Sequence, residues 1–156
     1  MKVKLPLMTK EEIKQLIEDQ VLCRIAFKGE KHPYIAPFQY ILINDSLYFH
    51  LTNYGRKIRL LKRDMRVCVE IEKYEPDLSK YSFVVLRGKL KIVTDLIERS
   101  EAIRKLVEVG NRRISEKFLA AHGLESTAGW SALTPEQAQI IVKLDEITEE
   151  IGIKSP

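Results

Sequence analysis

Residues 47–72 read LYFHLTNYGRKIRLLKRDMRVCVEIE, and this is the most informative segment of the chain. The run 47–52 alternates like a strand, and Gly55 follows a polar turn and begins a short helical piece over 55–64. Residues 66–73 alternate again. A strand, a turn, a short helix and a second strand in so short a span favour a small antiparallel barrel.

The same stretch places a histidine and two bases around one turn. His50 and Thr52 end the strand on one face, and Arg56 and Lys57 stand in the first turn of the helix. Free backbone N–H groups and the helix dipole favour an anion at such a position, and Gly55 lets the backbone approach it closely. Arginine can bind a phosphate through two hydrogen bonds, while lysine acts as a point charge. The pattern therefore predicts a phosphate site. The alternative is that the basic residues of the helix only form a solvent-exposed face.

The chain before this stretch supplies a helix and two strands. A helix is expected over 9–20, because Thr9 and Glu12 have the spacing of a capping box. Strands are expected over 21–27 and 34–43. The second of these is apolar on both faces, so a helix or a second subunit must cover the face that the barrel core does not.

The chain after this stretch is expected to complete the barrel and to add a helical insert. Gly88, in the middle of a strand over 81–94, predicts a bulge. The other expected elements are a helix from Asp95 to Gly110–Asn111 with Leu96, Ile103 and Val107 aligned, a helix over 112–122, a loop over 125–136 and a last strand over 139–147. Six antiparallel strands with flanking helices, in a single domain over residues 1–156, predict a closed or partly closed barrel.

Charge and hydropathy limit the partners and the location. The net charge of +4 suits an anionic partner of any kind, whether a phosphorylated cofactor, a nucleic acid or a membrane surface. No apolar run approaches the ~18 residues of a membrane span, and the N-terminus has no signal-peptide core. Cys23 and Cys68 lie far apart and are expected to be reduced packing thiols. We therefore expect a cytoplasmic protein with no membrane partner.

The histidines do not predict a metal site. His32, His50 and His122 are scattered, without acidic or cysteine neighbours at ligand spacing. We expect no bound metal.

Four segments in this order resemble the pyridoxamine 5′-phosphate oxidase-like FMN-binding split-barrel family. They are CRIAF (23–27), PYIAPFQY (33–40), residues 47–72 and YSFVVLRGKLKIV (81–93). The similarity is greatest to the branch of small flavin-binding and nitroimidazole-resistance-type proteins; it covers residues 8–95 and resumes weakly in the last strand. It implies a mainly β fold with flanking helices, a six-stranded antiparallel split β-barrel, and FMN held in a cleft between the two subunits of a homodimer.

The resemblance also implies which residues contact FMN. Arg56 and Lys57 would hold the phosphate, while His50, Leu51 and Thr52 would line the ribityl chain and the edge of the isoalloxazine ring. The remaining expected contacts are Arg24 and Ile25 on the first strand, Gln39 on the second, and Tyr81, Ser82 and Phe83 at the start of the later long strand. No residue is identified as catalytic. The 96–138 insert departs from the simplest members, and its Trp130 either closes over the flavin or packs on the barrel.

Three functions follow from these patterns. The first is an FMN-dependent oxidoreductase acting on an unknown small-molecule redox substrate, and the second is an FMN carrier or store without turnover. The third, from a different class, is an oligonucleotide-binding barrel, which shares the order of three strands, a short helix and two strands. Its stacking platforms would be Tyr34, Phe38, Tyr40, Tyr48 and Phe49, with Arg59, Lys62 and Arg63 supplying charge. The aromatic residues interleave with aliphatic ones as in a core, so nucleic acid is the less favoured partner.

Overall fold

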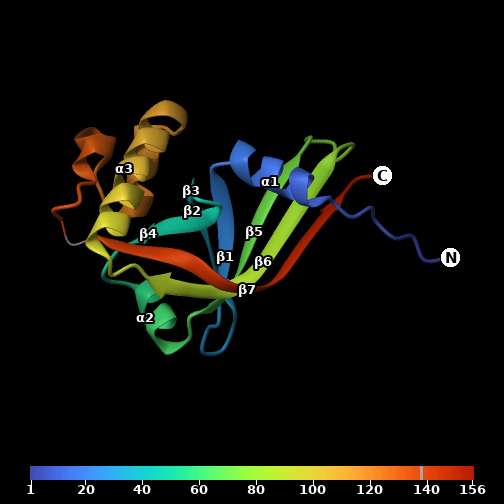
Figure 1. Ribbon diagram of the computed structural model, residues 1–156, viewed down its shortest axis with the longest axis horizontal. Helices are drawn as coiled ribbons and strands as arrows, with labels where there is room; N and C mark the ends of the chain where they lie inside the picture. The colour runs from blue at the N-terminus through green and yellow to red at the C-terminus, as the bar shows by residue number, and fades with distance from the viewer. Residues whose placement is uncertain (138) are drawn as a thin grey trace.

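The computed structural model describes residues 1–137 and 139–156, and its centre is one curled antiparallel sheet (Figure 1). Among these described residues, seven strands follow the order β2-β1-β5-β6-β7-β4-β3, and the sheet bends into a half-barrel. They are β1 (Leu22–Phe27), β2 (Tyr34–Gln39), β3 (Ile41–Ile43), β4 (Ser46–Leu51), β5 (Arg66–Tyr74), β6 (Tyr81–Ile92) and β7 (Ile140–Lys154). This mainly β architecture with flanking helices confirms the predicted fold class.

The sheet has one strand more than predicted, because the run 34–43 divides at Tyr40. The Tyr40 backbone N–H donates to the Val21 carbonyl at 3.2 Å, and the Tyr40 hydroxyl donates to the Ile17 carbonyl at 2.6 Å. The chain thereby turns from β2, which pairs with β1, into β3, which pairs with β4. The chain thus turns a corner of the half-barrel at Tyr40. The continuous apolar run 34–43 has no break that would predict this corner.

Helix α1 (Lys10–Asp19) begins where the capping box predicted. The Glu12 N–H donates to Thr9 Oγ1 at 3.2 Å, and the Thr9 N–H donates to the Glu12 carboxylate at 2.8 Å. Its apolar face joins the barrel core, which includes Ile13, Leu16, Ile17, Ile25, Phe49, Val69, Val84 and Leu90. Helix α1 therefore covers part of the half-barrel interior.

Helix α3 (Leu96–Arg113) covers the opposite face of the sheet at β3, β4 and the start of β7. A second core forms there, from Ile41, Tyr48, Ala102, Ile103, Leu106, Val109, Leu133 and Ile141. A helix therefore covers the second apolar face of the 34–43 run at Ile41, while Ile35 remains 62% exposed.

The helical insert differs from the prediction in three respects. Helix α3 continues through Gly110–Asn111, where an end was expected, because Gly110 is a contact point and not a cap: a Cβ there would lie 2.2 Å from Trp130 Cδ2. The predicted helix over 112–122 is instead the 3-10 segment η1 (Glu116–His122). Leu96, expected on the buried face, is 74% exposed.

The predicted bulge and the last strand meet in the β6–β7 ladder. The register shifts between Arg87 and Lys89, which confirms the bulge at Gly88. Strand β7 continues beyond the expected end at 147, because its charged second half pairs with the beginning of β6.

The loop over 125–136 contains the short turns η2 (Ser126–Ala128) and η3 (Trp130–Ala132). Ala138, the last residue of the 96–138 insert, lies outside the described residues. Over the part of the chain that is described, no helix has both the length and the apolar character to cross a membrane.

Candidate functional site

The turn before α2 (Arg56–Arg63) is where two cations meet. Gly55, the residue before the helix, has φ +92°, a conformation that favours glycine. The apolar side of α2 is anchored in the barrel core by Ile58, Leu60 and Leu61. Because this side is buried, the first turn is held in place with Arg56 exposed and Lys57 half-buried.

Arg56 and Lys57 both lie beside aromatic rings. The Arg56 guanidinium lies 5.4 Å from the centroid of the Tyr34 ring, and Lys57 Nζ lies 4.8 Å from that of Phe38. Over residues 1–137 and 139–156, neither has a carboxylate within the 4.0 Å of an ion pair. Burial lowers the pKa of the Lys57 amine, because its charge is partly desolvated. An anion at this turn would supply the missing counter-charge.

A chain of polar side chains is buried beside the strand that leads into this turn. Gln39 Nε2 donates to the Leu106 carbonyl at 3.2 Å, and Gln39 Oε1 lies 2.8 Å from His122 Nε2. The Nδ1 atoms of His122 and His50 are 3.0 Å apart, and His50 Nε2 contacts the side-chain amide of Gln139. We call Gln39, His122, His50 and Gln139 the histidine chain.

The environment of the histidine chain keeps both imidazoles neutral. His50 and His122 are only 5% and 6% exposed, and Phe118 and Trp130 pack edge-on against His122. Burial lowers the pKa of His122 to about 3 and also lowers that of His50. The charge of Lys57 acts on both rings in the same direction.

Stability should therefore fall as the pH is lowered from about 6.5, the unfolded value for histidine. The unfolded chain takes up protons on His50 and His122 in this range and the folded chain does not, so protonation favours unfolding. The free energy of unfolding should fall by up to about 1.4 kcal/mol per pH unit for each such histidine. Urea unfolding between pH 7 and pH 5, above the usual carboxylate range, measures this slope. His32→Gln, at an exposed turn, should leave the slope as it is; an unchanged stability over this range would contradict a neutral buried pair.

The structure brings some of the predicted contacts together at this place. Gln39 and His50 belong to the histidine chain, and Arg56 and Lys57 begin the adjacent helix. Thr52 is half-buried, and its hydroxyl donates to the Tyr54 carbonyl at 2.8 Å within the turn.

Three other predicted contacts face different surroundings. Ile25 and Leu51 are buried in the barrel core, at 0% and 2% exposure, so within one chain neither residue is open to a ligand. Arg24 lies on the outer face of β1, where its guanidinium pairs with Glu70 at 3.4 Å and with Glu72.

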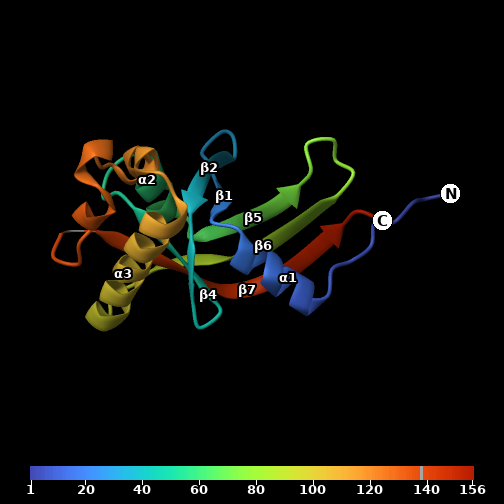
Figure 2. The same ribbon diagram turned by 90° about the horizontal axis from the view of Figure 1, so that it is seen from above.

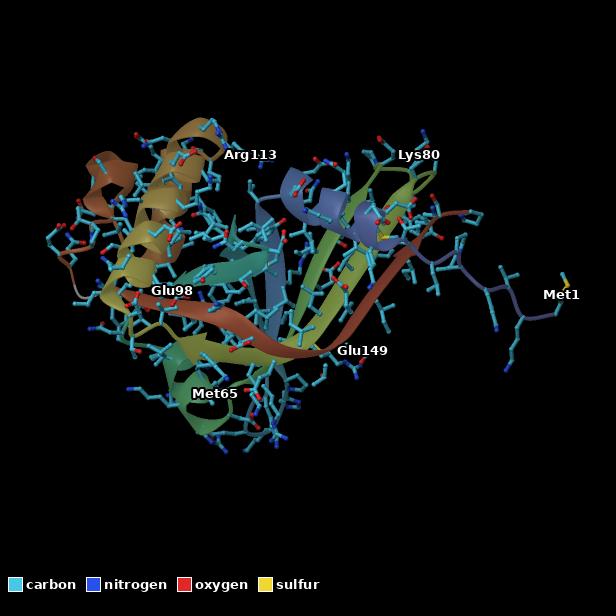
Figure 3. The ribbon with its side chains drawn as sticks, in the orientation of Figure 1. Met1, Met65, Lys80, Glu98, Arg113 and Glu149 are labelled. Carbon is cyan, nitrogen blue, oxygen red and sulfur yellow. The ribbon has the colours of Figure 1, made fainter. Side chains whose placement is uncertain are left out.

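Tyr81, Ser82 and Phe83 lie at the other end of the sheet. Phe83 pairs with Ile153 near the end of β7, whereas His50 pairs with Ile141 near its start. Figure 2 shows the β5–β6 hairpin extending away from α3, and in Figure 3 Lys80 at its tip lies far from Glu98 at the start of α3. Within one chain, these residues do not reach the turn before α2.

Sequence reasoning missed His122 and Gln139 as partners of His50. His122 follows His50 by 72 residues, and no local pattern connects them. The insert touches the turn before α2 at Gly123, which has φ +75°: a Cβ there would lie 2.9 Å from both Thr52 Cγ2 and the Tyr54 hydroxyl. Trp130 packs in the insert, where its Nε1–H donates to the Ile114 carbonyl at 3.2 Å.

Comparison with solved structures shows the same fold in several proteins. An FAD-binding protein from Mesorhizobium loti has a TM-score of 0.73 and 18% identity over 99% of this chain and 100% of its own. A candidate 5-nitroimidazole antibiotic resistance protein from Bacteroides thetaiotaomicron has a TM-score of 0.65 and 20% identity, over 97% and 87%. An FAD-binding protein from Mycobacterium smegmatis has a TM-score of 0.63 and 14% identity, over 96% and 97%. At such identities the likeness establishes the fold alone.

The sequence itself gives the family. No curated protein matches this chain in sequence. The family model described as pyridoxamine 5′-phosphate oxidase matches residues 9–142, which is most of the chain and includes every strand through the start of β7. The chain belongs to the pyridoxamine 5′-phosphate oxidase family.

Proposed function

We propose that this protein is a flavoprotein that binds FMN, with the phosphate held by Arg56 and Lys57. The observation that carries the proposal is the pair of cations at the first turn of α2, one of them half-buried, which meet no carboxylate at ion-pair distance in the described part of the chain. A phosphate dianion offsets the desolvation of Lys57 and accepts hydrogen bonds from both side chains. Each such charge-assisted bond is worth roughly 1.5–3 kcal/mol, a sizeable part of the ~8 kcal/mol of a micromolar complex.

The rest of the cofactor would extend from this turn along β4. His50 and Thr52 would line the ribityl chain and the edge of the ring. When bound, the flavin supplies hydride or electron transfer, and the protein orients it and shields it from water. An oxidoreductase acting on a small redox substrate is the activity that we propose, with a carrier that does not turn over as the alternative.

FMN would lie between two subunits of a homodimer. The outer face of the sheet carries Leu22, Ile35 and Ile151, which are 43%, 62% and 42% exposed, around the Arg24 ion pairs. An apolar sheet face of this kind suits a second copy in a two-fold pair. Tyr81, Ser82 and Phe83 can then join the site only from the partner, because their own chain holds them at its opposite end.

The burial of the aromatic residues disfavours the oligonucleotide-binding alternative. Phe38, Tyr40, Tyr48 and Phe49 are all 5% exposed or less, so their rings are not available to stack on bases. Cys23 and Cys68 are free thiols, which is consistent with the cytoplasm as the proposed location.

Sedimentation of the protein after addition of excess FMN and desalting tests the proposal. We expect a flavin absorption band that sediments with the protein, at about one flavin for each 18.1 kDa chain and at twice the mass of one chain. FAD and riboflavin are the matched ligands, and riboflavin should be retained less well because it lacks the phosphate. Protein that sediments without flavin would refute the proposal that the protein is a flavoprotein. Flavin that sediments with the mass of one chain would refute only the proposal of a dimer. Retention of FAD in preference to FMN would identify FAD as the cofactor in place of FMN.

A further inference from the structure

The proton positions on both imidazoles follow from the hydrogen bonds of the histidine chain, taken in order from a backbone carbonyl. The Leu106 carbonyl can only accept, so the group that faces it at 3.2 Å is the Gln39 amide nitrogen. The Gln39 amide oxygen therefore faces His122 Nε2 at 2.8 Å, and that ring nitrogen must carry a proton. A neutral His122 then has an unprotonated Nδ1, which accepts from His50 Nδ1 at 3.0 Å. His50 must carry its proton on Nδ1.

This assignment leaves His50 Nε2 as a hydrogen-bond acceptor. In the structure Gln139 turns its amide oxygen toward this nitrogen, and its amide nitrogen donates to Gln137 at 2.8 Å. An oxygen facing Nε2 requires a proton there, hence an imidazolium on a His50 that is 5% exposed and near the positive Lys57. Rotating the two glutamine amides by 180° removes the conflict without any added charge. Because His50 Nε2 must accept a hydrogen bond, the group that faces it is the amide nitrogen of Gln139.

The chain is ordered from the surface inward. Gln139 is half-buried, whereas His50, His122 and Gln39 are 5%, 6% and 2% exposed. The N–H or O–H of a ligand can therefore take the place of the Gln139 amide at His50 Nε2 without breaking the inner bonds. An acceptor group on a ligand would be rejected there, because it would face the lone pair of the ring.

We propose that His122 is a positioning residue that, with Gln39, fixes His50 as the Nδ1–H tautomer, so that His50 Nε2 accepts a hydrogen bond from an N–H or O–H donor of the bound ligand. The tautomer follows from the chain itself; the identity of the ligand as the flavin, with a ribityl hydroxyl as the donor, rests on the function proposed above. His122 acts through His50 and does not touch the ligand.

Long-range proton–nitrogen correlation spectra of the flavin-free protein test the tautomers directly. Between pH 6 and pH 8 we expect two neutral histidines, one protonated at Nδ1 (His50) and one at Nε2 (His122). His32 in the exposed β1–β2 turn supplies the reference signal. His50 protonated at Nε2, or an imidazolium at neutral pH, would overturn the proposal whether or not the protein binds flavin.

Two variants of His122 separate positioning from packing. His122→Phe keeps a ring against Trp130 but removes the acceptor for His50, so the tautomer preference should be lost. His122→Gln lacks the ring but its amide oxygen can accept from His50 Nδ1, so the preference should be retained. Loss of the preference in both variants, or in neither, would contradict the positioning role.

Flavin affinity measured by fluorescence quenching completes the test. His122→Phe should weaken FMN and riboflavin equally, by about three- to tenfold, because one neutral hydrogen bond is lost and the phosphate is not involved. His122→Gln should restore most of this loss. An unchanged affinity in His122→Phe would overturn the contact with the ligand, and a failure of the wild-type protein to bind any flavin would overturn the proposed function while the tautomer spectra remain decisive for His122.

Discussion

FMN binding should weaken at least about a hundredfold when Arg56 and Lys57 are both replaced by alanine. Two charge-assisted hydrogen bonds to the phosphate are lost, at roughly 1.5–3 kcal/mol each, and about 1.4 kcal/mol corresponds to a factor of ten in affinity. Riboflavin lacks the phosphate, so its affinity should change little. Titration of both ligands by fluorescence quenching in the same buffer measures the difference.

The same helix provides a matched control for charge. Lys62→Ala with Arg63→Ala also removes two positive charges from α2, but from its last turn. This variant should bind FMN nearly as tightly as the wild type if position matters, and as weakly as the first-turn variant if only net charge does.

The affinity of the wild type should also fall with added salt, because the contacts are ionic. Equal losses for FMN and riboflavin would refute the phosphate assignment.

The second large effect is expected where α3 meets Trp130. An alanine at position 110 would place its Cβ 2.2–2.6 Å from three atoms of the indole, and Trp130 is 1% exposed and cannot move aside freely. Gly110→Ala should therefore destabilise the protein by about 1–3 kcal/mol, as overpacking does, although alanine is the better helix former. Asn111→Ala, at the exposed neighbouring position, should be neutral or slightly stabilising.

A double-mutant cycle isolates this contact. Trp130→Ala alone should lower the free energy of unfolding by about 3–5 kcal/mol, because it leaves a cavity between α3 and η3. In that background Gly110→Ala should no longer destabilise, and the helix propensity of alanine should add up to about 1 kcal/mol. Urea unfolding of the four proteins gives the coupling energy; simple additivity of the two changes would show that Gly110 and Trp130 do not make the contact.

Local chemistry was sufficient to predict the elements on which the site is built. The capping box at Thr9, the alternation of 66–73 and the glycine before Arg56 each act within a few residues, and the structure contains the helix, the strand and the turn that they predict. The order of the motifs was also sufficient for the family, because the turn that begins α2 carries its most specific residues in one continuous stretch.

The mainly β fold, the family and the pair of bases at the start of α2 could therefore be predicted from the sequence. The corner at Tyr40, the continuation of α3 past Gly110 and the partners of His50 became visible only in the folded chain. Each of these depends on a contact between distant segments: Tyr40 bonds to Val21 and Ile17, Gly110 meets Trp130, and His50 meets His122. Periodicity and capping report on neighbours along the chain, whereas a buried polar group takes its hydrogen-bond partner from whichever segment the fold brings beside it.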